Sequence, residues 1–301
     1  MVSFVEKTDK RTIDFMLLGI LACLWGSSYL FIKVAVVSIP PITLIAIRVV
    51  IAAAFLLTVM WGQGAQFPKD WQLWRLLLIQ AFFNSIASWT VLAWGEQYVD
   101  SALAGVLNST SPIFVLICSV FINRHEVLNG WKLVGVLVGM VGVVLIVGID
   151  TLGGIGKQAS AQLAVLVGAM LYAGAALHGK RLAALSPIVV SAGTMLWATL
   201  FLVPLSLAVD RPWTLMPTRD AVFAAIALGV LCTGVALILY FRLVRTLGSM
   251  GVASQSYLRA GVSVLLGIVV LGEHITVPIG IGLCATILGV IAINIRRGSK
   301  Q

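Results

Sequence analysis

Charged residues are scarce in this chain. Only 10% of its 301 residues are Asp, Glu, Lys or Arg, whereas 60% are hydrophobic, and the mean hydropathy is +1.07. Because soluble domains contain about 25% charged residues, this composition excludes an ordinary soluble domain. Acidic residues are scarcer than basic ones, with 11 Asp and Glu against 20 Lys and Arg, so the net charge is +9. The basic residues are scattered at the ends of apolar runs rather than gathered in one patch, so we expect no nucleic-acid partner.

Residues that hold metals or act as nucleophiles are also few. The four cysteines lie inside apolar runs without C-x-x-C spacing, and the three histidines form no H-E-x-x-H motif. These absences argue against a disulfide framework, a zinc site and a membrane-embedded enzyme. We therefore expect free thiols, no cofactor and no enzymatic activity.

Long apolar runs dominate what is present. Each is long enough, as a helix rising 1.5 Å per residue, to cross a hydrocarbon core of about 30 Å. The connections between the runs are short and leave no room for a separate soluble domain. The sequence thus predicts an all-α integral membrane protein with ten transmembrane helices, at 14–34, 40–61, 72–94, 99–122, 130–148, 160–180, 187–208, 219–241, 249–271 and 277–295.

The basic residues predict the orientation of these spans. With the N-terminus in the cytoplasm, only Lys33, Lys157, Arg211 and Arg219 lie on the outer side, and Arg48 and Arg259 lie inside spans. All other Lys and Arg then flank the cytoplasmic ends, as the positive-inside rule requires. We expect a multi-pass protein of a bacterial inner membrane with both termini in the cytoplasm.

The two halves of the chain resemble each other at an offset of 147 residues. The offset places Pro40 on Pro187, Ser109 on Ser256 and Glu126 on Glu273, among other matches from the first span to the last. Because each half contains an odd number of spans, the second half must cross the membrane in the opposite sense. The sequence therefore predicts two inverted five-helix repeats, 14–148 and 160–295, around a central cavity.

Two pairs of segments carry a resemblance to a known family. The run LWGSSYLFIK at 24–33 and its mate LYAGAALHGK at 171–180 resemble the first and sixth helices of the EamA-type branch of the drug/metabolite transporter superfamily. The helix ends NRHE at 123–126 and LGE at 271–273, each followed by a glycine-rich helix, are similar to the same pattern. The resemblance implies ten helices around a cavity and export of small metabolites, with bacterial exporters of aromatic and other neutral amino acids as the most similar group.

One position departs from the family pattern. Pro112 supplies the proline expected in the fourth helix, but the offset puts Arg259 at the matching place in the ninth. Arg259 lies on one helical stripe with Gln255, so the stripe should face a cavity or another helix. We consider two kinds of role for Arg259. It attracts the carboxylate of a substrate, or it is structural, in that it hydrogen-bonds to helix ends or to carbonyls exposed by a broken helix, or shapes the electrostatic potential of the lumen.

Other polar and aromatic side chains complete the candidate substrate site. Asn108 is the repeat mate of Gln255, and Asn84 belongs to a polar stripe on the third span. Trp25, Tyr29 and Tyr172 could line the cavity, with interfacial anchoring or ordinary packing as the alternatives. For Arg48 we favour a structural role over substrate binding, because it lies nearer a span end and could extend its head group to water. The set is Arg259, Gln255, Asn108, Asn84, Trp25, Tyr29, Tyr172 and Arg48.

The scarcity of acidic residues bears on energy coupling. No Asp or Glu is central in a predicted span, since residues such as Glu96 and Glu273 lie at or beyond helix ends. Buried carboxylates commonly bind coupling ions in carriers, so we expect alternating access without ion coupling, with proton exchange as the second hypothesis. For Glu273 we favour pairing with a nearby basic residue or capping of the next helix.

We expect a small-molecule substrate, lipid contacts and a monomer, with drugs or nucleotide-sugar-like solutes as the alternative substrates.

Overall fold

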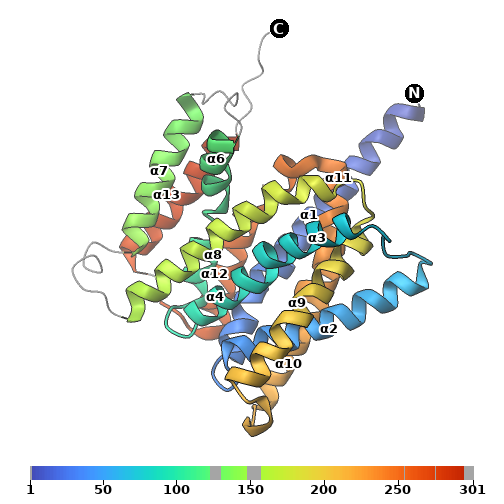
Figure 1. Cartoon of the computed structure of the whole chain (residues 1–301). Coiled ribbons are helices and arrows are strands. Elements are labelled where there is room, and N and C mark those ends of the chain that lie inside the picture. The colour runs from blue at the N-terminus through green and yellow to red at the C-terminus, as the bar shows by residue number, and fades with distance from the viewer. Residues whose placement is uncertain (1, 123–129, 148–156, 254, 275, 295–301) are drawn as a thin grey trace.

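The chain folds into a bundle of helices. The computed structural model describes residues 2–122, 130–147, 157–253, 255–274 and 276–294 (Figure 1). No residue in these ranges belongs to a strand. The helices of the first half are α1 (Val2–Ala35), α2 (Pro41–Gly62), α3 (Trp71–Ala81), η1 (Phe82–Ile86), α4 (Ala87–Gly95), α5 (Ser101–Asn108), α6 (Ser111–Ile122) and α7 (Gly130–Val147).

The second half has the same kind of elements. Its helices are α8 (Lys157–Gly179), η3 (Lys180–Leu182), α9 (Pro187–Val209), η4 (Pro212–Thr214), α10 (Arg219–Gly229), η5 (Val230–Val235), α11 (Ala236–Ala253), α12 (Gln255–Leu271) and α13 (Val277–Asn294). The all-helical prediction is confirmed for the described residues.

The number of spans is only partly settled. Seven apolar helical stretches are long enough to cross a membrane: Thr12–Ala35, Pro41–Gly62, Trp71–Gly95, Ser101–Cys118, Gln158–Leu182, Pro187–Val209 and Arg219–Val244. Three shorter apolar helices, Leu133–Gly142, Leu258–Leu271 and Gly280–Gly289, occupy the places of the other predicted spans within the described residues. Ten transmembrane helices in two inverted repeats therefore stay a prediction.

Several helix boundaries follow from simple rules. Pro41 and Pro187 stand at the starts of α2 and α9, where a proline has no intrahelical hydrogen bond to lose. Pro40 is the repeat mate of Pro187, so both second spans of the halves begin in a similar way. The predicted gap between 241 and 249 is wrong, because α11 continues through it as helix to Ala253.

Two helices contain a short π-helical stretch at corresponding places. The stretch η1 interrupts the span formed by α3 and α4, and η5 interrupts the span formed by α10 and α11. They begin at Phe82 and Val230, close to the repeat offset. A π-helical turn widens the helix and frees local backbone groups, and both stretches contain buried polar side chains, Asn84 and Ser85 in one and Thr233 in the other.

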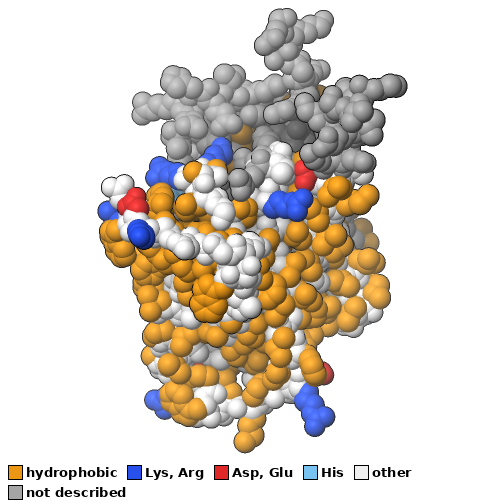
Figure 2. Space-filling model, turned by 90° about the vertical axis from the view of Figure 1, so that its right-hand side faces the viewer, with side chains coloured by type: hydrophobic (Ala, Val, Ile, Leu, Met, Phe, Trp, Pro, Cys, Tyr) orange, Lys and Arg blue, Asp and Glu red, His pale blue; other side chains and the backbone are white. Residues whose placement is uncertain are grey.

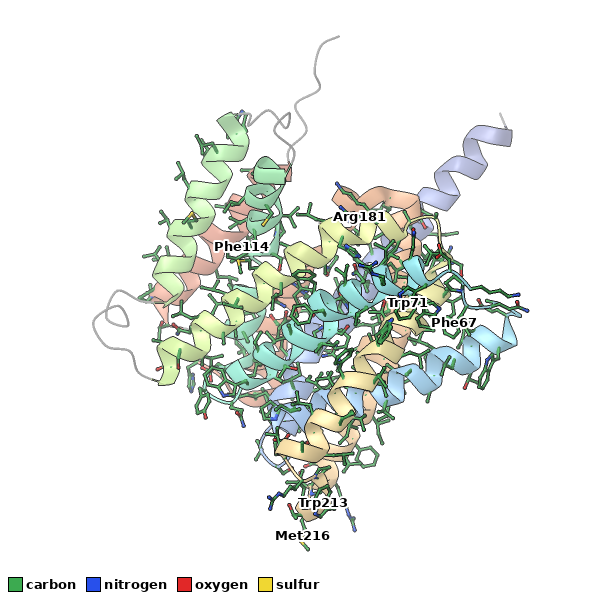
Figure 3. The ribbon with its side chains drawn as sticks, viewed as in Figure 1. Phe67, Trp71, Phe114, Arg181, Trp213 and Met216 are labelled. Carbon is green, nitrogen blue, oxygen red and sulfur yellow. The ribbon has the colours of Figure 1, made fainter. Side chains whose placement is uncertain are left out.

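The surface is typical of a protein surrounded by lipid. Figure 2 shows hydrophobic side chains across the middle of the face and Lys and Arg toward its ends. Figure 3 shows Trp213 and Met216 at the opposite end of the bundle from Arg181. Trp213 and Met216 are highly exposed, which suits residues at a membrane–water boundary.

Glycines let the outer helices pack closely. Figure 1 shows α6, α7 and α13 grouped on one side of the molecule and α2, α9 and α10 on the other. A Cβ at Gly289 of α13 would come within 2.5 Å of the backbone of Gly135 and Gly139 on α7. The G-x-x-x-G pair of α7 therefore packs against a helix of the other half of the same chain.

Candidate functional site

Two glycine contacts fix the position of α12, which carries Arg259. A Cβ at Gly26 of α1 would lie 2.6 Å from the side chain of Val262, and one at Gly105 of α5 would lie 2.0 Å from Oγ of Ser263. Because neither α1 nor α5 has a side chain there, α12 approaches both backbones. The polar stripe of α12 therefore faces α1 and α5 rather than lipid.

Arg259, Asn108 and Tyr29 form one chain of contacts. The NH2 group of Arg259 donates to the backbone oxygen of Asn108 at 3.3 Å, and Nδ2 of Asn108 donates to the hydroxyl of Tyr29 at 2.7 Å. All three side chains are buried. Asn108 is the last residue of α5, so Arg259 binds a carbonyl at a helix end, as one of our two hypotheses stated. Nε of Arg259 and Oδ1 of Asn108 have no partner among the described residues.

Arg48 lies in a second cluster and does not reach water. Its side chain is 3% exposed, so the expectation that it extends to the membrane surface is wrong. The guanidinium carbon lies 3.9 Å from the ring centre of Trp89, and Nε donates to Oγ1 of Thr233 at 2.7 Å. Nε1 of Trp89 in turn donates to the hydroxyl of Tyr172. A cation over an aromatic face gains about 2 kcal/mol or more when the pair is desolvated.

The two clusters share one region of the interior. Tyr29 and Tyr172 each interact electrostatically with both Arg48 and Arg259. Neither arginine hydrogen-bonds to a carboxylate of the described residues; Arg48 binds Thr233 and Arg259 binds a carbonyl. The structure therefore brings together two cations, two phenols and an indole. Neither cation has a directly bound anion among the described residues.

The remaining predicted residues are placed less centrally. Gln255 begins α12 and is buried, with no partner for its Oε1 among the described residues. Asn84 lies in η1 and donates to Ser85 at 3.0 Å. Trp25 packs against Tyr240, with ring centres 5.2 Å apart, which favours the packing interpretation. No hydrogen bond or ring contact within the described residues links these three to either arginine.

Glu273 binds a helix of the other half rather than the next helix. Its Oε1 accepts hydrogen bonds from the backbone and hydroxyl of Ser101 at 2.8 Å, and its Oε2 accepts one from the backbone of Ala102 at 3.0 Å. A carboxylate at the N-terminus of α5 satisfies free N–H groups and interacts favourably with the helix dipole. Its repeat mate, Glu126, lies outside the described residues.

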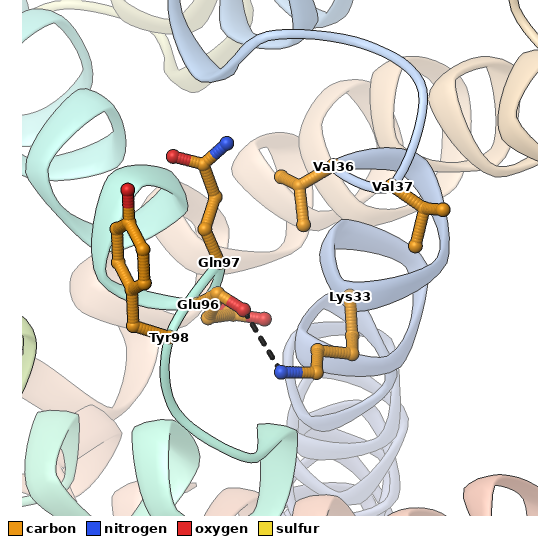
Figure 4. A pocket seen from close by; sticks show the side chains of 6 residues that line it. All are labelled: Lys33, Val36, Val37, Glu96, Gln97 and Tyr98. Carbon is orange, nitrogen blue, oxygen red and sulfur yellow. Dashed lines mark hydrogen bonds between the residues drawn. The ribbon is translucent and has the colours of Figure 1, made fainter. Parts of the chain in front are cut away.

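Glu96 is a buried acid that the sequence interpretation passed over. It directly follows α4, yet its side chain is fully buried. Burial raises the pKa of Glu96 well above its ordinary value, an effect that the nearby Lys33 only partly opposes. A pocket of about 280 Å³ lies beside it, lined by Lys33, Val36, Val37, Glu96, Gln97 and Tyr98 (Figure 4).

No metal or cofactor is needed to account for these groups. Within the described residues, no cluster of three or more His, Cys, Asp or Glu could hold a metal ion. The buried nitrogens of Arg48 and Arg259 are donors only, so what they can bind is a hydrogen-bond acceptor such as an anion, a carbonyl group or a hydroxyl oxygen.

Comparisons with known proteins agree on the class of protein. The chain is 25% identical to the uncharacterized inner membrane transporter YedA of Escherichia coli K12 over 253 residues, 84% of this chain and 81% of that protein. It is 24% identical to the uncharacterized transporter YoaV of Bacillus subtilis over 270 residues, 89% of this chain and 92% of YoaV. An uncharacterized transporter of Archaeoglobus fulgidus is 26% identical over 280 residues, 91% of this chain and 95% of that protein.

Fold and family comparisons extend this result. A crystal structure with 23% sequence identity superposes with a TM-score of 0.64, covering 92% of this chain and 94% of the other, which shows a shared fold. The sequence pattern of the EamA-like transporter family matches the chain twice, at residues 15–148 and 159–295. The chain therefore belongs to the EamA-like transporter family, within the drug/metabolite transporter superfamily, and is a membrane transporter.

Proposed function

We propose that the protein exports small metabolites that carry a carboxylate, foremost amino acids with neutral or aromatic side chains, across a bacterial inner membrane. The observation that carries this proposal is the pair of buried arginines, neither of which hydrogen-bonds to a carboxylate of the described residues. A cation inside a membrane protein is costly unless it has a partner. The carboxylate of a substrate would supply that partner, with two N–H groups of one guanidinium donating to its two oxygens.

The aromatic groups support the same proposal. Trp89 and Tyr172 lie beside Arg48, and Tyr29 lies beside Asn108 near Arg259. Rings next to a carboxylate-binding group are suited to an amino acid with an apolar or aromatic side chain. A drug or a nucleotide-sugar-like solute is the alternative substrate, and an uncharged drug would gain less from the two arginines than a carboxylate would.

Alternating access is the proposed mode of transport. The family sequence pattern matches each half of the chain, and π-helical stretches occupy corresponding places in both. Such a repeat supports two halves that move against each other around a shared site. The relative YedA is described as an inner membrane transporter, which supports an inner-membrane location for this protein. The distribution of basic residues supports a cytoplasmic position for both termini.

The carboxylate hypothesis is tested by comparing phenylalanine with its methyl ester. In proteoliposomes, competition against phenylalanine counterflow gives the apparent affinity of each compound. We expect Arg259→Ala to lower the apparent affinity for phenylalanine at least about tenfold, which corresponds to about 1.4 kcal/mol. The apparent affinity for the ester should change much less. Arg242→Ala, which removes an exposed arginine of α11, is the matched control and should change neither. Equal losses for acid and ester in Arg259→Ala would contradict carboxylate recognition by this residue.

A further inference from the structure

Glu96 stands out among the polar groups that the proposed substrate site does not use. Its side chain is 0% exposed, and neither carboxylate oxygen has a hydrogen-bond partner among the described residues. An ionised carboxylate in that environment would lose its hydration without any hydrogen bond to replace it, which disfavours the charged form. The neutral, protonated form avoids most of that desolvation penalty.

Lys33 of α1 approaches Glu96 but is engaged elsewhere. Its Nζ donates to the backbone oxygen of Glu96 at 3.0 Å (Figure 4). It also donates to the backbone oxygen of Val99 at 2.5 Å. The ammonium group therefore ties α1 to the connection between α4 and α5 through carbonyls, and makes no hydrogen bond to the Glu96 carboxylate. The acid is left without a directly bound counter-ion.

The other charged and titratable groups around Glu96 come from α1, from α2 and from the residues after α12. Arg48 of α2 and the carboxylate of Glu273, after α12, interact with it electrostatically, and so does Tyr29 of α1. Glu273 disfavours a second negative charge, whereas Arg48 favours one. On the remaining side, α8 meets Gly95 through apolar Val165 and a backbone carbonyl. Burial outweighs the two cations, so the pKa of Glu96 stays well above its ordinary value.

Geometry gives this acid a route to water. Glu96 lines the pocket of about 280 Å³ together with Lys33 and Gln97, and Gln97 and Tyr98 are exposed. The walls of the pocket come from the end of α1 and from the residues after α4. A small separation of these two segments would admit water to the carboxyl group.

We infer that Glu96 is a proton-binding site of the transporter, neutral in the observed arrangement and deprotonated when the ends of α1 and α4 separate. In the deprotonation step the O–H bond of the carboxyl breaks and the proton passes to water in the pocket. The carboxylate that remains can then pair with Lys33, whose Nζ is released from the two carbonyls. This inference rests on the proposed alternating access for the helix separation. It favours proton coupling over the uncoupled transport expected from the sequence.

The sign of the pH effect follows from the raised pKa. Between the ordinary carboxyl pKa of 4.5 and the raised pKa of Glu96, the folded arrangement holds a proton that an exposed carboxyl has already lost. The stability that this bound proton contributes to the folded protein is therefore fully present below pH 4.5 and is lost as the pH rises through the raised pKa of Glu96. Glu96→Gln replaces the neutral acid by an uncharged group of similar shape, so it should not show this loss.

Infrared spectroscopy tests the protonation directly. The purified wild-type protein, titrated with pH in D₂O, should still show the carbonyl stretch of a protonated carboxyl at a pH where exposed carboxyl groups are ionised, and the band should disappear at higher pH. Glu96→Gln should lack that band. Asp100→Asn, which removes an exposed acid four residues away, should retain it. A band of unchanged intensity in Glu96→Gln, or no such band in the wild type, would overturn the inference.

Two functional measurements separate this inference from the proposed substrate. The wild-type midpoint of thermal unfolding in detergent should fall with rising pH more steeply than that of Glu96→Gln, while Asp100→Asn should follow the wild type. In proteoliposomes, phenylalanine counterflow by the wild type should slow with rising pH, and Glu96→Gln should lose that dependence. If the wild type carries no phenylalanine at any pH, the substrate proposal fails, and the infrared and thermal results still decide the role of Glu96.

Discussion

The hydrogen bond of Arg48 depends on one hydroxyl in a π-helical turn. Oγ1 of Thr233 accepts from Nε of Arg48 and donates to the backbone oxygen of Leu228, both at 2.7 Å. Thr233→Val would leave a buried donor without an acceptor, which costs about 1–3 kcal/mol. We expect a clear fall in the midpoint of thermal unfolding for Thr233→Val, measured in detergent. Thr233→Ser keeps the hydroxyl and is the matched control; a Val variant as stable as the Ser variant would show that the hydrogen bonds of Oγ1 contribute little.

The two arginines show what a single sequence reveals about a residue inside a span. Arg259 was singled out because it lies near the middle of an apolar run, and the structure places it beside Asn108 and Tyr29. Arg48 was interpreted as a residue that reaches water, since it lies nearer the start of its helix. That start, at Pro41 of α2, is about 10 Å away along the helix. Distance along one helix could not show that Trp89 and Thr233 close over the side chain.

Trp89 and Glu96 were missed for related reasons. A tryptophan in an apolar run has no distinguishing periodicity, and only its ring contact with Arg48 reveals a role. Glu96 lies one residue beyond α4, where acidic side chains usually reach water. The helix ends around it exclude water in the folded molecule. Its position directly after an apolar span, with a lysine at the end of α1, was the available signal.

At the scale of elements, glycines decide how closely α12 approaches its neighbours. Gly105→Ala would put a Cβ 2.0 Å from Oγ and 2.5 Å from Cβ of Ser263, so α5 and α12 must separate. We expect a large fall in thermal stability and faster hydrogen–deuterium exchange in α5. Gly261→Ala, on α12 with nothing within 4 Å of its added Cβ, should be neutral or slightly stabilising, because alanine is the better helix former.

A second substitution sharpens the test of this contact. Ser263→Gly removes the two atoms nearest to the new methyl group and leaves only Cδ2 of Tyr29 at 3.3 Å, so it should restore much of the stability lost in Gly105→Ala. If the double variant is no more stable than Gly105→Ala alone, close packing of α5 on α12 is not the cause of the loss.

Helix identity was easier to predict than helix continuity. Hydropathy located apolar segments because lipid requires long apolar surfaces. It did not reveal the π-helical stretches η1 and η5 or the continuation of α11 to Ala253. At both π-helical stretches a hydroxyl, that of Ser88 or Thr233, donates to a backbone oxygen five residues earlier, and a one-dimensional apolar pattern contains no record of such bonds. The break after Asn108 likewise interrupts a segment that was predicted as one span.

At the scale of the whole molecule, the distribution of basic residues predicts which end faces the cytoplasm. Arg181 and Met216 are both exposed and lie at opposite ends of the bundle (Figure 3). Under the predicted orientation, Arg181 is cytoplasmic and the connection that contains Met216 faces outward. We expect a membrane-impermeant maleimide to label Met216→Cys in intact spheroplasts, and Arg181→Cys only after permeabilisation.

The native cysteines provide the background for this measurement. Cys23 and Cys284 are exposed to the surroundings of the bundle, and Cys232 is buried. Cys23 and Cys232 lie within candidate spans and Cys284 within a shorter apolar helix, where lipid would surround an exposed thiol. A membrane-impermeant maleimide does not enter lipid, so these cysteines should give little labelling in the wild type. The reverse pattern of labelling would show that the molecule has the opposite orientation in the membrane. Glu96 would then exchange its proton with the cytoplasm instead of with the outer side.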